Sequence, residues 1–285
     1  MAVVAAAPLS AQESSLPVTA QPLTSADEQA IAAHLDPLVD DLEHGDPAKA
    51  QRARDLIAAP VRGPASVSFR LYYSGRLDDA IARMVAPTAD PWRAGLALSV
   101  AGAVATDPML GVILGALDDP RPAVRLAAAR ELGTTLEQVD ADNDAIQDAR
   151  LDAALRRAQR ALEQEPSVHV AGTLALALAG PETPALQDRA LAAMARGFGA
   201  WLDARGPAGE PDAEETLLTT INVLRVARMR YVNRQIRGGA PAELTDAVLA
   251  LARAARAAAG RAVDHADLAD RASAVADALT QLAQG

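Results

Sequence analysis

The stretch that decides the fold runs from Asp118 to Gly133 and reads DDPRPAVRLAAARELG. It follows a helix that the apolar pattern predicts to end at Leu117, and it opens on an Asp-Pro turn at Asp119 and Pro120. Aspartate accepts the N–H bonds that the first turn of a helix leaves unpaired, and proline suits the first helical position because it has no N–H to lose. Three apolar residues then share one helical face at intervals of four: Val124, Ala128 and Leu132. The stretch therefore predicts two helices joined by a tight turn.

The same turn signal recurs along the chain at a regular spacing. Further acid–proline dipeptides are Asp36-Pro37, Asp46-Pro47, Asp90-Pro91, Asp107-Pro108, Glu165-Pro166 and Glu210-Pro211. An acid at the positive end of a helix dipole, followed by a proline that fits only the first turn, marks a helix start. The distances are 44 residues from Pro47 to Pro91, 46 from Pro120 to Pro166 and 45 from Pro166 to Pro211. This spacing predicts a repeat of helix pairs, although only 29 residues separate Pro91 from Pro120.

A helix–turn–helix unit with this period resembles a HEAT repeat, which spans about 40–47 residues. The best match covers Met109 to Gly133, and the resemblance extends from about Asp36 to Leu178. It implies an all-α protein of the α-solenoid type, in which antiparallel helix pairs bury their apolar faces against neighbouring pairs. We expect residues 25–180 to form these repeats. Residues 181–285 match the repeat poorly and predict a less regular helical region that continues or caps the array, with helices over Ala185–Leu202, Asp212–Arg237, Glu243–Ala259 and Asp264–Leu282.

The composition supports an all-α chain and excludes several classes of function. Half of the residues are apolar but only 2% are aromatic, and no alternating strand pattern is present. The formal net charge of −10 argues against broad nucleic-acid binding, which needs a cationic surface. Lys49 is the only lysine, so the other 26 of the 27 basic residues are arginine, a bias more easily explained by genome composition than by selection for guanidinium chemistry. The absence of cysteine excludes disulfides and a thiolate nucleophile.

The first 24 residues predict a segment outside the repeats. Met1 to Ala11 is short and apolar and resembles the end of a secretory signal peptide, without a basic region before it. The favoured interpretation is an exported or periplasmic protein, and the alternative is an alanine-rich tail on a cytoplasmic one. Gln12 to Thr24 predicts a flexible lead-in, and no run of about 18 apolar residues predicts a membrane span.

An acidic segment after the best repeat unit suggests a calcium loop. Four carboxylates occupy positions 1, 3, 5 and 9 of an EF-hand-like loop: Asp140, Asp142, Asp144 and Asp148. Position 6 is Ala145, where an EF-hand has glycine, and position 12 is Leu151, where it has a bidentate glutamate. The alternative to a weak calcium site is a solvated acidic loop between helices. No other cofactor is expected.

Two groups of side chains are candidates for binding a partner. On the predicted helix Asp212–Arg237, one face carries three basic residues, Arg230, Arg234 and Arg237, opposite Leu218, Ile221, Val232 and Ile236. This face suits an acidic partner or an anionic ligand, unless it is an ordinary solvated face. The second group is aromatic. Tyr72 and Tyr73 follow Phe69 and are either interface anchors or core-filling residues in an alanine-rich interior.

These observations lead to one functional expectation and two alternatives. The expectation is a non-catalytic scaffold that binds a protein partner on the extended surface of a HEAT-like array. No nucleophile elbow, metal-binding HExxH helix, phosphate loop or dinucleotide fingerprint appears in the sequence. The first alternative is a ligand-binding protein or enzyme on a HEAT-like frame, with a groove lined by aromatic and charged residues. The second is a calcium-stabilised structural protein of the cell envelope.

Overall fold

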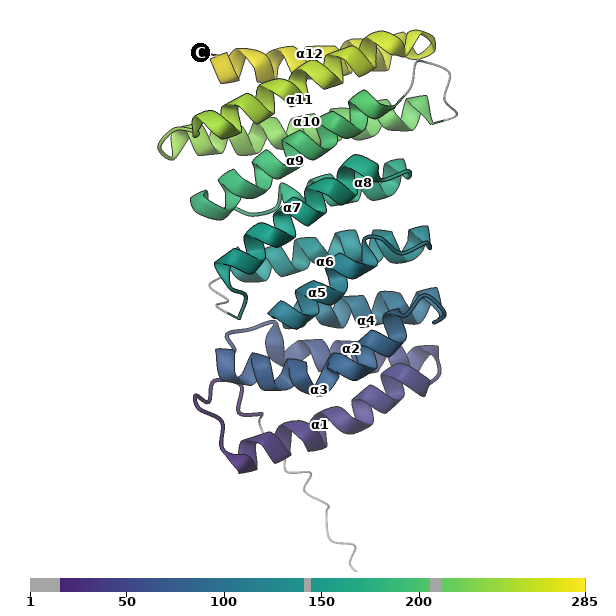
Figure 1. Ribbon diagram of the computed structural model, residues 1–285, viewed down its shortest axis with the longest axis vertical. Coiled ribbons are helices and arrows are strands. Elements are labelled where there is room, and N and C mark those ends of the chain that lie inside the picture. Colours follow the sequence, from purple (N-terminus) through teal and green to yellow (C-terminus); the bar gives the residue numbers. More distant parts are fainter. Residues whose placement is uncertain (1–15, 141–144, 206–211, 285) are drawn as a thin grey trace, which may run out of the picture.

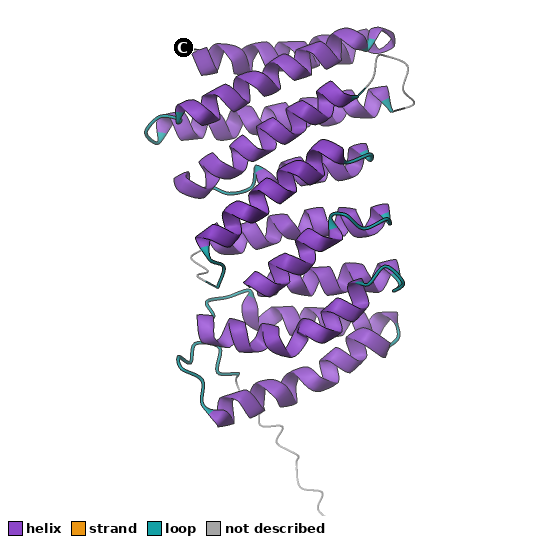
Figure 2. Ribbon diagram, in the orientation of Figure 1, coloured by secondary structure: helices purple, strands orange, loops and turns teal. Residues whose placement is uncertain are grey.

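The computed structural model describes residues 16–140, 145–205 and 212–284, and within these ranges every regular element is a helix (Figures 1 and 2). The predicted signal-peptide remnant, Met1 to Ala11, lies outside the described residues. The α-helices are α1 (Ser25–His44), α2 (Pro47–Ala58), α3 (Val67–Val85), α4 (Pro91–Val104), α5 (Asp107–Ala116), α6 (Pro122–Asp140), α7 (Asp148–Gln164), α8 (Val168–Leu178), α9 (Pro184–Ala204), α10 (Ala213–Ile236), α11 (Ala242–Arg261) and α12 (Ala266–Gln284). Two short 3-10 turns, η1 (Ala59–Val61) and η2 (Val263–His265), follow α2 and α11. The expectation of an all-α protein is confirmed.

The helices follow one another along the longest axis of the molecule, from α1 at one end to α12 at the other (Figure 1). Each odd-numbered helix packs against the even-numbered helix that follows it, and each helix also packs against the helix two positions along. The odd-numbered helices therefore form one row, the odd row, and the even-numbered helices form a second, the even row. Helices α9 to α12 keep the same alternation as the helices before them.

The acid–proline signals explain several helix starts. Asp46 and Asp90 cap α2 and α4 by accepting backbone N–H bonds, and Pro47 and Pro91 are the first helical residues, as the sequence predicts. Helix α1 begins with a capping box between Thr24 and Asp27, in which Thr24 is the cap. The cap lies one residue before Ser25, where the folded region is predicted to begin. Residues 16–24, part of the predicted flexible lead-in, lie against α3, where Ser66 donates to two of their carbonyl oxygens.

Three of the acid–proline predictions are wrong in position. Glu165-Pro166 lies before α8, which begins at Val168 and is capped by Ser167. Asp36-Pro37 does not separate helices, because α1 continues through Pro37. Pro37 is exposed there, so water can satisfy the carbonyl group that loses its helical donor. Helix α6 begins at Pro122 instead of Pro120. Asp119 accepts from the backbone N–H of Arg121 at 2.8 Å and pairs with its guanidinium, which lowers the pKa of the Asp119 carboxyl.

The core extends through the whole stack and is built mainly from small and aliphatic side chains. Val124, Ala128 and Leu132 are fully buried, which confirms the predicted inner face of α6. The large side chains fill the interior in pairs: Phe69 stacks on Tyr73 and Phe198 on Trp201, each with ring centroids 5.1 Å apart. Within the described residues, no helix is both long enough and apolar enough to cross a bilayer.

Glycines set how closely neighbouring helices of one row approach. A Cβ at Gly102 in α4 would lie 2.6 Å from Oε2, 3.0 Å from Cβ and 3.1 Å from the carbonyl oxygen of Glu131 in α6. A Cβ at Gly172 in α8 would lie 2.7 Å from Cγ2 of Thr219 in α10. Any residue larger than glycine at position 102 or 172 would collide with the facing helix, so these two glycines allow the close packing.

Replacing a glycine with alanine should have opposite effects at a close helix contact and at an open position of a helix. Gly102→Ala forces α4 and α6 apart, and we expect it to lower the free energy of unfolding by about 1–3 kcal/mol. A Cβ at Gly75 in α3 meets nothing within 4 Å. Gly75→Ala should therefore raise stability by up to about 1 kcal/mol through helix propensity alone. Urea unfolding followed by circular dichroism measures both, and a stabilising Gly102→Ala would contradict the packing described here.

Charged side chains link parts of the chain that are one repeat apart. In the described part of the chain, several ion pairs of arginine with aspartate or glutamate join residues separated by 37 to 48 positions. Arginines also donate to the backbone carbonyls of an earlier turn or helix end: Arg93 to Leu42 and Gly45, Arg121 to Ala86, Arg205 to Pro166, Arg230 to Gly180, and Arg261 to Leu202. The many arginines thus stabilise contacts between successive repeats, which is not predicted from the sequence.

Candidate functional site

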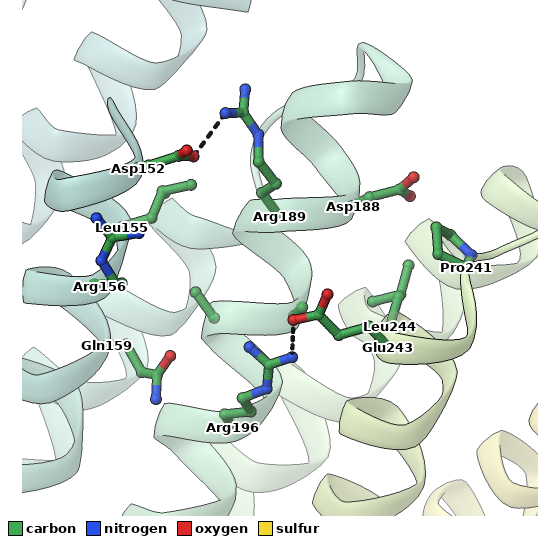
Figure 3. Close-up of a pocket in the computed structure, with 12 residues that line it drawn as sticks. Asp152, Leu155, Arg156, Gln159, Asp188, Arg189, Arg196, Pro241, Glu243 and Leu244 are labelled. Atoms are coloured by element: carbon green, nitrogen blue, oxygen red, sulfur yellow. Dashed lines mark hydrogen bonds and ion pairs between the residues drawn. The ribbon is translucent and has the colours of Figure 1, made fainter. Parts of the chain in front are cut away.

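A groove crosses three consecutive helices of the odd row. It has a volume of about 430 Å³ and lies on α7, α9 and the start of α11 (Figure 3). Twelve residues line it: Asp152, Leu155, Arg156, Gln159, Asp188, Arg189, Ala192, Ala193, Arg196, Pro241, Glu243 and Leu244. The groove therefore collects side chains from a segment of more than ninety residues.

The floor of the groove is apolar, and small residues on its central helix make it hollow. Leu155, Ala192, Ala193 and Leu244 are all buried and come from the three different helices. Ala192 and Ala193 on α9 leave room between the larger side chains of α7 and α11. One turn further along α9, Gly197 allows close packing, because a Cβ there would lie 3.1 Å from the carbonyl oxygen of Gln159. The alternation of small and large residues across the row creates the depression.

The walls of the groove carry charges that neutralise one another. Arg189 donates to Asp152 at 2.6 Å, and Arg196 donates to Glu243 at 2.5 Å (Figure 3). Asp188 accepts two hydrogen bonds from Arg234 of α10, at 2.7 and 3.0 Å. These bonds raise the pKa of the Arg234 guanidinium. The walls thus offer both signs of charge over an apolar floor.

Arg156 differs from the other arginines of the groove. Its side chain is exposed on α7, and no acidic partner is found for it among the residues that the structure describes. Beside it, the amide of Gln159 donates to Glu163 at 2.8 Å and keeps its carbonyl oxygen available as an acceptor. Arg156 is therefore the lining cation that can bind an acidic group without first breaking an internal ion pair.

The three basic residues predicted to share a binding face do share one face of α10, but they contact their own chain. Arg230 donates to Glu182 at 2.7 Å and to the carbonyl oxygen of Gly180 at 2.9 Å. Arg234 pairs with Asp188, and Arg237 donates to the carbonyl oxygen of Glu182 at 3.0 Å. The side chains of Arg230 and Arg234 are only 16% and 14% exposed. A partner that bound them would have to displace these contacts.

The predicted apolar side of α10 is only partly buried. Ile221 lies in the core, but Leu218 and Ile236 are 48% and 78% exposed. The buried face is instead formed by residues on a different arc of the helix: Leu217, Thr220, Ile221, Val223, Leu224, Ala227 and Tyr231. Arg225 and Arg228 are both exposed. The inner face of this helix was therefore predicted with the wrong orientation.

The two tyrosines separate into a core residue and a residue of the partly exposed surface. Tyr73 is fully buried, and its hydroxyl donates to the carbonyl oxygen of Ile57 at 2.8 Å. Burial also raises the pKa of Tyr73. Tyr73 fills the core together with Phe69 and cannot reach a partner. Phe69 and Tyr73 are therefore core-filling residues and not interface anchors. Tyr72 is half-buried, and its predicted role as an anchor stays a prediction.

The predicted calcium loop cannot be assembled from the described residues. Asp142 and Asp144 lie outside the described residues, and so does the side chain of Asp140. Asp148 is the first residue of α7, with an exposed carboxylate 3.6 Å from Nη2 of Arg189. Among the side chains that the structure describes, no group of three or more histidine, cysteine, aspartate or glutamate residues could hold a metal ion. The calcium site stays a prediction.

The groove is not predicted from the sequence, although a signal for part of it is present there. Arg189 follows Asp152 by 37 positions, and Glu243 follows Arg196 by 47. These separations are close to the repeat period, so opposite charges one period apart on outward positions indicate neighbouring helices of one row. The apolar floor gives no such signal, because its alanines and leucines resemble core residues in the sequence.

Comparisons with known proteins do not assign the chain to a family. No protein-family model, no curated protein and no solved structure matches it.

Proposed function

We propose that the protein is a non-catalytic HEAT-like α-solenoid scaffold that binds a protein partner. The observation that carries the proposal is the groove, which combines an apolar floor with walls of both charges across three helices. Protein-binding surfaces commonly have this composition, with an apolar centre and a polar rim. The partner segment would lie across α7, α9 and α11 and place an acidic group on Arg156.

The arrangement of the helices supports the solenoid part of the proposal. Each helix packs on its neighbours in sequence and on the helix two positions along, as in stacked hairpins. Ion pairs join residues 37 to 48 positions apart, close to the period of about 40–47 residues of HEAT-like repeats. Such stacks commonly bind their partners on the extended curved surface that successive repeats form.

The composition of the groove favours a binding protein over an enzyme. A catalytic groove on such a frame would bring aromatic residues and free carboxylates together. None of the twelve residues that line the groove is aromatic. Its three acidic residues, Asp152, Asp188 and Glu243, each pair with an arginine.

Site-specific photo-crosslinking in extracts of the native host tests the proposal. With a photoreactive amino acid in place of Gln159, we expect a discrete crosslinked product, because this residue lines the groove. Asp79 is exposed on α3 of the same row, outside the groove, and the same replacement there is the matched control. Arg156→Glu should weaken the Gln159 product about tenfold, because charge reversal at an interface affects both attraction and orientation. Equal products at Gln159 and Asp79, or none at either position, would contradict the proposal.

A further inference from the structure

The outward side of α10, on the even row, exposes large apolar side chains in a line. Leu218, Met229 and Ile236 are 48%, 49% and 78% exposed. They account for three of the seven exposed large apolar side chains in the described part of the chain. At 100° per residue, all three lie within about 20° of one another around the helix axis. They therefore lie along one line of the helix surface, and we call this line the α10 stripe.

The α10 stripe has the length of a helical docking surface. From Leu218 to Ile236 the helix rises about 27 Å, at 1.5 Å per residue. Asn222 and Arg225 are exposed, and both lie within about 40° of the line of the three apolar residues. The three apolar residues recur on this line after three and then two helical turns, so a second helix packed alongside α10 would contact all of them.

The charge on this helix is opposite to that of the rest of the chain. Residues 216–237 contain five arginines and no aspartate or glutamate, in a protein of formal net charge −10. Arg230, Arg234 and Arg237 contact Glu182 and Asp188 of the same chain. Arg225 and Arg228 are exposed, and within the ranges that the structure describes neither has an acidic partner. Arg225 therefore lies on the α10 stripe between Leu218 and Met229, and Arg228 lies about 80° to one side of it. Neither charge is compensated within the described part of the chain.

We propose that the α10 stripe is a docking surface for an amphipathic helix that carries acidic residues beside its apolar face. The apolar residues of the partner would cover Leu218, Met229 and Ile236, and its carboxylates would pair with Arg225 and Arg228. Burial of these three side chains favours association, and the arginines select the charge and register of the partner. The stripe belongs to the even row and the groove to the odd row, so this surface is separate from the groove and is tested separately.

Two other occupants fit the charges less well. A membrane with anionic lipids would attract Arg225 and Arg228, but the remaining surface carries a strong negative charge that the membrane repels. In a symmetric pair of copies joined stripe to stripe, each partner would bring the same two arginines to the interface. The charge pattern therefore favours an acidic helix of a different protein.

A synthetic peptide provides the direct test. The probe is a fluorescent helical peptide with leucines at positions i, i+4, i+7 and i+11 and glutamates on both sides of them. We expect saturable binding by fluorescence anisotropy, weaker at high salt, and slowed hydrogen exchange that is concentrated in α10. A peptide with the same composition in scrambled order should not bind. A third peptide has lysine in place of each glutamate and should bind at least about tenfold more weakly.

Substitutions at exposed positions separate docking from folding. We expect Met229→Glu and Leu218→Glu each to weaken binding of the glutamate peptide about tenfold or more. Leu71 on α3 is 49% exposed, like Met229, so Leu71→Glu is the matched control and should leave binding unchanged. The double variant Arg225→Glu/Arg228→Glu should lose the glutamate peptide and gain the lysine peptide. Circular dichroism should show the same helix content for all four proteins, because these side chains lie at the surface.

Several outcomes would overturn the proposal. Equal binding of the ordered and scrambled peptides, or an equal loss in Leu71→Glu, would show that binding is not specific to the α10 stripe. No saturable binding of the glutamate peptide would also reject it. Flotation with vesicles containing phosphatidylserine, abolished by Met229→Glu, would assign the stripe to a membrane. A dimer in light scattering that Met229→Glu dissociates would assign it to a second copy of the chain.

Discussion

Replacing Arg125 with methionine is expected to lower the free energy of unfolding by about 3–5 kcal/mol, because it leaves a buried carboxylate without its counter-charge. Arg125 in α6 donates from Nε and Nη2 to the two carboxylate oxygens of Glu165, both at 2.9 Å. The two side chains are only 11% and 4% exposed. After the substitution, Glu165 keeps the backbone N–H of Ser167 as a donor, at 2.8 Å. One neutral donor does not offset the desolvation of a carboxylate.

A matched variant and a double variant make this prediction specific. Arg157 and Asp118 form an ion pair of similar sequence separation, but their side chains are 44% and 65% exposed. Arg157→Met should therefore change stability by less than about 1 kcal/mol. Arg125→Met/Glu165→Met removes both charges and should recover at least half of the loss. Chemical unfolding followed by circular dichroism measures all three, and equal losses in Arg125→Met and Arg157→Met would contradict the structure.

Replacing Arg70 with methionine is expected to lower the free energy of unfolding by about 3 kcal/mol or more, through the loss of several buried hydrogen bonds. Arg70 is 4% exposed, and its burial lowers the pKa of the guanidinium. Nη2 donates to the carbonyl oxygen of Val61 at 2.7 Å, and Nη1 to that of Val104 at 3.0 Å. Val104 ends α4, where carbonyl groups lack helical donors and carry partial negative charge. Without Arg70, these carbonyl groups stay buried and unpaired.

The control for Arg70 lies close by in the sequence. Arg62 is exposed, and Arg62→Met should change stability by no more than about 0.5 kcal/mol. Hydrogen exchange adds a local measurement, because the last turn of α4 should exchange faster in Arg70→Met than in the wild type. A stability of Arg70→Met equal to that of Arg62→Met would show that water, or another donor, replaces the guanidinium.

The sequence predicts several helix starts and buried faces of this protein because local signals determine them. Asp46 and Asp90 cap the helices that follow them, and Val124, Ala128 and Leu132 face the core as their spacing indicates. Local signals fail where a longer helix overrides them. Pro37 lies inside α1 because flanking residues extend the helix past one missing hydrogen bond.

The candidate sites were harder to predict because they depend on which neighbour each helix receives. Tyr73 and Tyr72 are adjacent in the sequence, yet only the packing of α3 shows that the first is enclosed and the second half-buried. In α10, Leu218 and Ile236 look like core residues, but the small side chains of Thr220 and Ala227 face the interior instead. Opposite charges spaced about one repeat apart along the odd row can be recognised in the sequence, whereas the apolar floor of the groove cannot.

The arrangement in two rows has a mechanical consequence. Because each helix packs on neighbours at most a few elements away, a pulling force at the two ends acts on every hairpin in turn rather than on one central layer. Small changes in the angle between successive hairpins can then add up to a large change in end-to-end distance. If the proposed solenoid is correct, the two ends of the molecule should therefore separate at a lower force than those of a globular domain of equal size.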